Sequence, residues 1–147
     1  MWRKSSTLRH PLFPELKAAE ADKARGSHPA LAGTFLQLWH AGLRGAAARR
    51  AIFLVHDSGS PWVAESEREM LWRLFEVPVL GLLVNERREV LAYECEAQQG
   101  MHLNSSAWSV PHAAVDSSAC SCGRSGQRLV PAASILSAAE RELPVAV

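Results

Sequence analysis

The sequence has few of the features that mark membrane-spanning, secreted or aromatic-rich binding proteins. Aromatic residues make up 7% of its 147 residues, and only 1 of them is a tyrosine. No apolar run approaches the roughly 20 residues that a membrane-spanning helix needs. Met1-Trp2-Arg3-Lys4 is followed by polar residues, whereas a secretory signal continues into an apolar segment. We therefore expect a cytoplasmic protein with no membrane partner.

The chain also has almost no excess of positive over negative charge, because its formal net charge is +1. The charges are nevertheless unevenly distributed. Residues 1–50 hold nine Lys/Arg and three Asp/Glu, whereas residues 51–101 hold four Lys/Arg and nine Asp/Glu. The basic third has no aromatic residues interleaved with its cations and no nucleic-acid-binding motif. We therefore predict no nucleic-acid partner, and we expect the basic part to lie against the acidic part.

Cysteine is the third scarce residue type, with 3 in the chain. An odd number of thiols, in a compartment that keeps them reduced, argues against a disulfide framework. The roles that remain for these thiols are metal binding, redox chemistry and plain burial.

Apolar residues, by contrast, are sufficient for one hydrophobic core. They make up 48% of the chain, and charged residues make up 21%, close to the averages of globular domains. We predict a single domain over residues 1–147, with a helical N-terminal part (1–50), a core (51–130) and a C-terminal helix and tail (131–147). The expected fold class is α/β (α+β), a small mixed sheet with packed helices and a loop-rich C-terminal third.

Apolar spacing predicts helices in the first third of the chain. Residues 15–25 have a helical composition with a thin apolar face. Leu31, Phe35, Leu38 and Trp39 recur at the spacing of an amphipathic helix, which we expect to end near residues 42–45.

The pattern of the central third predicts a strand, a helix and two more strands. The apolar run 51–55 is typical of a strand buried on both faces. The next helix is predicted over Glu65 to Phe75. Ser60 before Pro61 suits an N-cap followed by a first helical position ahead of this segment. Strands are predicted over 79–84 and 90–93, and a last helix over 131–143. The side chains predicted to be buried are Leu54, Leu71, Leu74, Val79 and Leu91.

Four potential metal ligands lie close together in the last third of the chain. They are Cys95, His102, Cys120 and Cys122. Three thiolates and one imidazole satisfy the tetrahedral preference of structural zinc. A zinc ion at this point would staple a loop-rich region that otherwise lacks a core.

Other interpretations of these residues stay open. A Cys-x-Cys pair is less diagnostic than paired Cys-x-x-Cys motifs, so buried inert thiols are the main alternative. His112 is a competing ligand. Glu94 and Glu96 flank Cys95 and form either an acid pair or a solvated strand face. His10 is expected at the surface or at a cap, because it stands apart from other ligand types.

Some motifs in this region resemble phenylacetate-CoA ligases and the related coenzyme F390 synthetases, which are adenylate-forming enzymes. Residues 60–62 read Ser-Pro-Trp before an acidic helix, and residues 94–102 read Glu-Cys-Glu-Ala-Gln-Gln-Gly-Met-His. Residues 120–124, Cys-Ser-Cys-Gly-Arg, resemble the family's Cys-Pro-Cys-Gly-Arg. The resemblance covers roughly residues 52–130. In the family these cysteines and this histidine can hold zinc, so the resemblance implies a structural Zn²⁺ on Cys95, His102, Cys120 and Cys122.

The sequence departs from that family where the nucleotide would bind. In place of the family's Tyr-Gly-Leu-Thr-Glu segment, residues 82–86 read Leu-Leu-Val-Asn-Glu, which leaves Glu86 as the one catalytic candidate. No phosphate loop and no lid with a catalytic lysine are recognisable, although acyl adenylation needs donors that stabilise its developing charge. We therefore expect a noncatalytic zinc-binding module with an interaction or regulatory role, whose partner is an adenylate-forming enzyme or another protein. The alternative is residual AMP-forming acyl-CoA ligase activity or CoA-ester binding, alone or with a partner.

Overall fold

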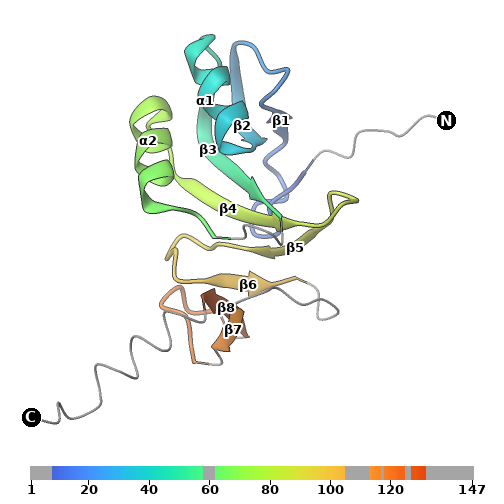
Figure 1. The fold of residues 1–147 in the computed structure, drawn as a ribbon. Coiled ribbons are helices and arrows are strands. Elements are labelled where there is room, and N and C mark those ends of the chain that lie inside the picture. Colours follow the sequence, from blue (N-terminus) through green and yellow to red (C-terminus); the bar gives the residue numbers. More distant parts are fainter. Residues whose placement is uncertain (1–7, 58–61, 105–112, 117, 125–126, 132–147) are drawn as a thin grey trace, which may run out of the picture.

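The computed structural model describes residues 8–57, 62–104, 113–116, 118–124 and 127–131, and within them the chain forms one mixed sheet with two helices (Figure 1). The sheet has eight strands in the order β1-β2-β3-β4-β5-β6-β8-β7. In chain order the elements are β1 (Ala18–Glu20), β2 (Ser27–Gly33), α1 (Phe35–Leu43), β3 (Ala47–His56), α2 (Glu65–Phe75), β4 (Val79–Val84), β5 (Val90–Tyr93), β6 (Met101–Leu103), β7 (Ala113–Asp116) and β8 (Arg128–Pro131). The predicted α+β class with a mixed sheet is thus confirmed.

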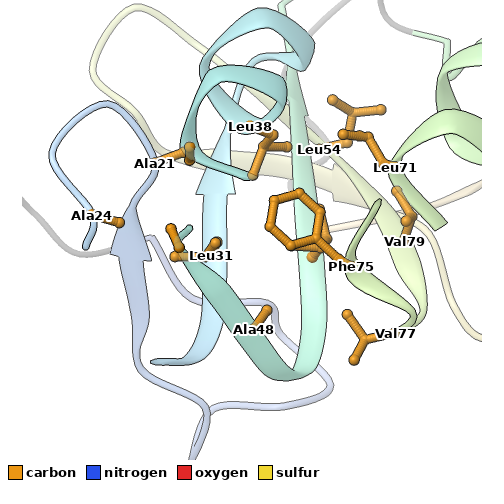
Figure 2. Close-up of a cluster of buried hydrophobic side chains, with 13 residues drawn as sticks. Ala21, Ala24, Leu31, Leu38, Ala48, Leu54, Leu71, Phe75, Val77 and Val79 are labelled. Carbon is orange, nitrogen blue, oxygen red and sulfur yellow. The ribbon is translucent and has the colours of Figure 1, made fainter. Parts of the chain in front are cut away.

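Strands β1 to β4 form a parallel half, in which α1 connects β2 to β3 and α2 connects β3 to β4. All six residues of β4 are buried, as expected for a strand covered on both faces. The two helices lie on the same face of the sheet (Figure 1). Leu38 of α1 and Leu71 and Phe75 of α2 meet there over Leu31 and Leu54 of the strands (Figure 2).

The helices approach each other closely at Gly42. A Cβ atom at this position would lie 2.3 Å from Leu74 Cδ2 and 3.1 Å from Phe75 Cζ. Because a side chain does not fit there, glycine fixes the contact between α1 and α2.

The opposite face of the parallel half is covered by the N-terminal arm, residues 8–17. Leu8 and Leu16 pack there with Phe53 and Leu80 of the central strands. His10 is fully buried in this layer, so the expectation of a surface or cap role is wrong. Its Nδ1 accepts a hydrogen bond from the Leu12 amide at 3.1 Å, so Nε2 carries the proton and donates to the Glu94 carbonyl at 2.6 Å.

Strands β5, β6, β8 and β7 form an antiparallel half that continues the same sheet. Its buried apolar residues Ala92, Met101 and Leu129 form a cluster of four with Leu83 of the adjoining strand β4. Among the described residues, three short strands lie between the loops of the C-terminal third. Its apolar core is nonetheless small.

The predicted helices of the first third need correction. Residues 15–25 form β1 and turns, because Ala18 and Ala19 pair with residues of β2 and this strand pairing overrides the helical composition. Leu31 lies in β2, where it pairs with Ile52. Helix α1 begins only at Phe35, because the Thr34 hydroxyl accepts from the Gln37 amide while the Gln37 side chain accepts from the Thr34 amide.

The central elements agree with the prediction more closely. Helix α2 and strands β4 and β5 have the predicted bounds, and the predicted strand over 51–55 is part of β3. The N-cap of α2 is Ala64, not Ser60, which lies outside the described residues together with Pro61. Leu54, Leu71 and Val79 are buried, whereas Leu74 and Leu91 are half-buried.

Two further predictions concern the C-terminal helix and the contact between the basic and the acidic part of the chain. The predicted helix over 131–143 falls almost wholly outside the described residues, and Pro131 itself ends β8. Among the described ion pairs, the one that joins the first 50 residues to residues 51–101 pairs Arg88 with Glu20, the reverse of the expected charges.

Neither described helix is long and apolar enough to cross a membrane.

Candidate metal centre

The four predicted ligands converge on one point. One ligand atom from each of Cys95, His102, Cys120 and Cys122 lies within 4.8 Å of each of the others. Cys95, His102 and Cys120 are buried, and Cys122 is partly exposed. The prediction that these side chains gather around one site is confirmed, and the group can hold a metal ion.

Two of the distances match the edges of a tetrahedral site. Metal–ligand distances of about 2.3 Å to sulfur and about 2.0 Å to nitrogen imply S···S edges of about 3.8 Å and S···N edges of about 3.6 Å. The Cys95 and Cys120 Sγ atoms are 3.6 Å apart. The Cys122 Sγ atom is 3.6 Å from His102 Nε2. These two distances are therefore close to those expected around one tetrahedral ion.

Cys95 comes from the chain that follows β5. The turn after it is closed by a hydrogen bond from the Gln98 amide to the Cys95 carbonyl, 3.0 Å long. Gly100, with φ of 85°, then redirects the chain into β6, and a Cβ there would lie 2.7 Å from the Leu129 carbonyl oxygen. This close passage places His102, two residues later, beside β8.

Cys120 and Cys122 lie in a second tight turn. The Gly123 amide donates to the Cys120 carbonyl at 3.0 Å, and Gly123 has a φ of 85°. The Arg124 amide lies 3.5 Å from the Cys122 sulfur and donates to it. The Ala97 amide makes an equivalent hydrogen bond to Cys95. Each half of the site thus has a backbone N–H directed at a thiol two residues earlier, which favours the thiolate that binds metals.

His102 is held in its neutral form. It pairs with Tyr93 of β5 and Arg128 of β8 in the sheet, and its ring stacks on Tyr93 with centroids 5.5 Å apart. Burial lowers the pKa of His102, and the positive charges of Arg128 and Arg124 lower it further. Neutral imidazole is the form that binds a metal.

The thiols differ in protonation because their surroundings differ. Burial raises the pKa of Cys95 to about 11. Burial acts in the same direction on Cys122, but hydrogen bonds from the Arg124 amide and guanidinium and from the neighbouring thiols bring its pKa to about 7. Without a cation, Cys95 would hold its proton at neutral pH, and a metal ion would displace that proton.

Arg128 ties the segments of the site together, a role that its sequence position did not reveal. Its guanidinium donates to the Gln99 carbonyl at 2.5 Å and to the Ser118 hydroxyl at 3.2 Å, and it lies 3.3 Å from an Asp116 carboxylate oxygen. The side chain is buried, with 6% exposed. Arg128 therefore joins both ligand turns to β8. The one sequence signal was the resemblance to phenylacetate-CoA ligases, in which a Pro-Arg follows the Cys-Pro-Cys-Gly-Arg motif where this chain has Gln127-Arg128.

Glu94 and Glu96 are neither an acid pair nor a shared solvated face. The buried Glu94 carboxylate accepts two hydrogen bonds from the Arg68 guanidinium, at 2.7 and 3.0 Å, and one from the Gly81 amide at 2.6 Å. The exposed Glu96 carboxylate instead pairs with Arg124 at 2.8 Å. The two side chains diverge because the chain leaves the β5 strand after Tyr93 and no longer alternates.

The described candidate that remains, Glu86, lies away from this centre. Glu86 is exposed in the loop between β4 and β5, whereas Cys95 follows the opposite end of β5. His112 lies outside the described residues. The metal centre therefore does not include the proposed catalytic carboxylate.

No protein-family model matches this chain, and no curated protein matches it. What the structure defines is an α+β protein with a Cys/His cluster at its antiparallel end. The resemblance to phenylacetate-CoA ligases stays a prediction from the sequence motifs.

Proposed function

We propose that this chain is a noncatalytic zinc-binding module in which Cys95, His102, Cys120 and Cys122 hold one structural Zn²⁺. The observation that carries the proposal is the convergence of the four ligand atoms within 4.8 Å. Soft thiolates with one imidazole in a tetrahedral arrangement favour zinc over the hard cations, which prefer oxygen ligands.

The surroundings of the cluster suit a closed zinc site. Three thiolates on a dication leave a net charge of −1, and the cations of Arg124 and Arg128 lie near enough to act on the ligands. Four protein ligands fill a tetrahedron, so no position is left for an activated water. The role of the ion is therefore to hold the two ligand turns and β6 together.

An interaction or regulatory role, with an adenylate-forming enzyme or another protein as partner, rests on the motif resemblance and on exposed apolar side chains. Leu36 and Leu43 of α1 are each 64% exposed, and Trp72 of α2 is 50% exposed. Exposed apolar side chains mark a contact site where they form one contiguous patch.

The metal assignment is tested on protein purified without chelator. Elemental analysis is expected to give one zinc per chain, and substitution with Co²⁺ is expected to give the intense visible absorption of a tetrahedral thiolate site. Cys120→Ser is expected to lose stoichiometric metal. The matched control is Ser121→Ala, which removes an exposed hydroxyl between the two ligands. Wild-type protein without stoichiometric zinc, or an octahedral Co²⁺ spectrum, would refute the proposal.

The alternative function is residual acyl-CoA ligase activity or CoA-ester binding. Glu86 is its test residue, because it stands where the family has a motif glutamate. Calorimetric titration with ATP and with CoA is expected to give no binding heat, and an adenylate-formation assay no product. Adenylate formation that disappears in Glu86→Gln would favour the enzyme over the noncatalytic module.

A further inference from the structure

A cavity of about 530 Å³ lies where the N-terminal arm, α2 and the chain after Cys95 meet the amino ends of β3 and β4. Its apolar lining includes Phe13 and Leu16 from the arm, Leu80 from β4 and Trp72 from α2. A volume of this size, a mainly apolar lining and a few polar groups are typical of sites for small organic molecules.

The cavity has a cationic side chain without a counter-ion. Arg50 lines it, and within the described part of the chain Arg50 takes part in no ion pair or hydrogen bond. The β2–β3 register shifts at this point, so that Arg49 and Arg50 together face Pro29. Such a bulge redirects side chains. Arg49 turns to the Ser27 hydroxyl at 3.1 Å, whereas Arg50 reaches the cavity.

The other charged groups of the lining leave the cavity with a positive excess. Glu96 is neutralised by Arg124 at 2.8 Å. Arg68 is neutralised by Glu94, but its Nε atom is buried without a hydrogen-bond acceptor within the described structure, and the nearest carboxylate oxygen, of Glu65, is 3.5 Å away. The unmatched groups are thus the guanidinium of Arg50, an exposed residue, and one buried Arg68 N–H, and an anionic acceptor in the cavity can pair with them.

We propose that this cavity binds a small amphipathic organic anion, with an apolar body against Phe13, Leu16 and Leu80 and a single anionic head at Arg50. The Trp72 ring lies at the exposed side of the same cavity and covers the apolar body. Glu96 and Gln98 line the cavity, but none of the four metal ligands does, so the cavity is separate from the metal centre.

The test is an NMR titration of ¹⁵N-labelled protein, purified without chelator, with octanoate and in parallel with the neutral 1-octanol. Octanoate is expected to give saturable shifts at the Trp72 indole N–H and at the Ala51 and Leu80 amides, with an affinity at least about tenfold above that of 1-octanol. Arg50→Gln is expected to remove this difference between the two probes. Arg49→Gln, the matched control from the other side of the bulge, is expected to keep it.

Three results would overturn the proposal. They are the absence of saturable shifts in the wild type, saturable shifts confined to residues away from the cavity, and equal affinity for octanoate and 1-octanol. A preference for octanoate that survives in Arg50→Gln would equally remove the assigned role of Arg50. None of these outcomes bears on the zinc content, so the two proposals fail independently.

Discussion

The parallel and antiparallel halves of this sheet are held together by different means. The parallel half has apolar clusters on both faces, with 13 buried residues under the helices and 10 under the N-terminal arm. The antiparallel half has a cluster of four. It relies instead on buried polar groups, namely the Cys/His cluster and the guanidinium of Arg128.

This difference shows how a short run of chain can be ordered without a large core. Apolar burial contributes about 25 cal/mol per Å², so a cluster of four buried side chains offsets little of the backbone entropy of the segments after β5. A bound metal acts at one point but fixes three segments of the chain there. We therefore expect the two halves to respond differently to the same perturbation.

Metal removal is expected to have the largest effect and to be confined to the antiparallel half. Structural zinc contributes roughly 10–16 kcal/mol in small zinc domains at pH 7. With a strong chelator, hydrogen exchange is expected to accelerate across residues 95–131, while the amides of α1 and β3 stay protected. Uniform loss of protection over both halves would show that they do not differ in this way.

Glu94→Gln is expected to weaken the boundary between the halves. The Glu94 carboxylate joins Arg68 of α2 to β4, and its side chain is 8% exposed. Loss of its charge leaves the buried Arg68 cation with the Val79 carbonyl at 2.6 Å and the exposed Glu65 carboxylate at 3.5 Å. We expect a loss of about 3 kcal/mol of unfolding free energy, the lower end of the range for breaking a buried ion pair. The measurement is denaturant unfolding of the metal-loaded protein.

The control for this pair is Glu69→Gln, because Glu69 forms an exposed pair with Arg73. Its loss is expected to change the unfolding free energy by less than about 1 kcal/mol. Equal effects of Glu69→Gln and Glu94→Gln would contradict the distinction between the buried and the exposed pair.

Leu71→Ala is expected to destabilise the parallel half by about 2–4 kcal/mol, because it leaves a cavity in the cluster beneath the helices. Zinc stoichiometry is expected to stay unchanged, since Leu71 lies in a different cluster from the metal ligands. Met70→Ala, on the exposed side of the same helix, serves as control in thermal and denaturant unfolding. A metal-deficient Leu71→Ala protein would mean that the halves do not hold together independently.

His10 gives an expected effect that appears only as the pH falls. Burial lowers its pKa from 6.5 to about 4. As the pH falls from 6.5 to 4, the unfolded chain binds a proton that the folded chain does not, so stability is full above pH 6.5 and is lost toward pH 4. The loss attributable to His10 is about 3 kcal/mol.

The measurement compares unfolding free energies of wild type and His10→Gln between pH 7 and pH 4. The variant is expected to lose less stability over this range, and subtraction removes the metal release that both proteins share. Substitution of the exposed His40 by Gln is the control. An unchanged pH dependence in His10→Gln would show that burial does not keep this ring neutral.

Sequence patterns predicted the central elements well because their signals are local. The apolar stripe and acidic first turn of Glu65–Phe75 mark a helix within eleven residues, and the runs of β4 and β5 are bounded by polar residues. Leu31 was misassigned because its spacing to Phe35 fits a helix. The Thr34 capping box separates the two residues, and strand pairing with Ile52 decides the conformation of Leu31.

The sequence by itself determined the chemistry of this protein, and above all the set of three thiols and one imidazole, because residue types and motif spacing are read directly. Only the tertiary structure decided which polar groups are buried and what they face. Buried His10, the Arg68–Glu94 pair, the position of Arg128 and the cavity at Arg50 all depend on contacts between segments far apart in the chain. Desolvation and hydrogen-bond partners are properties of those contacts, and no local pattern encodes them.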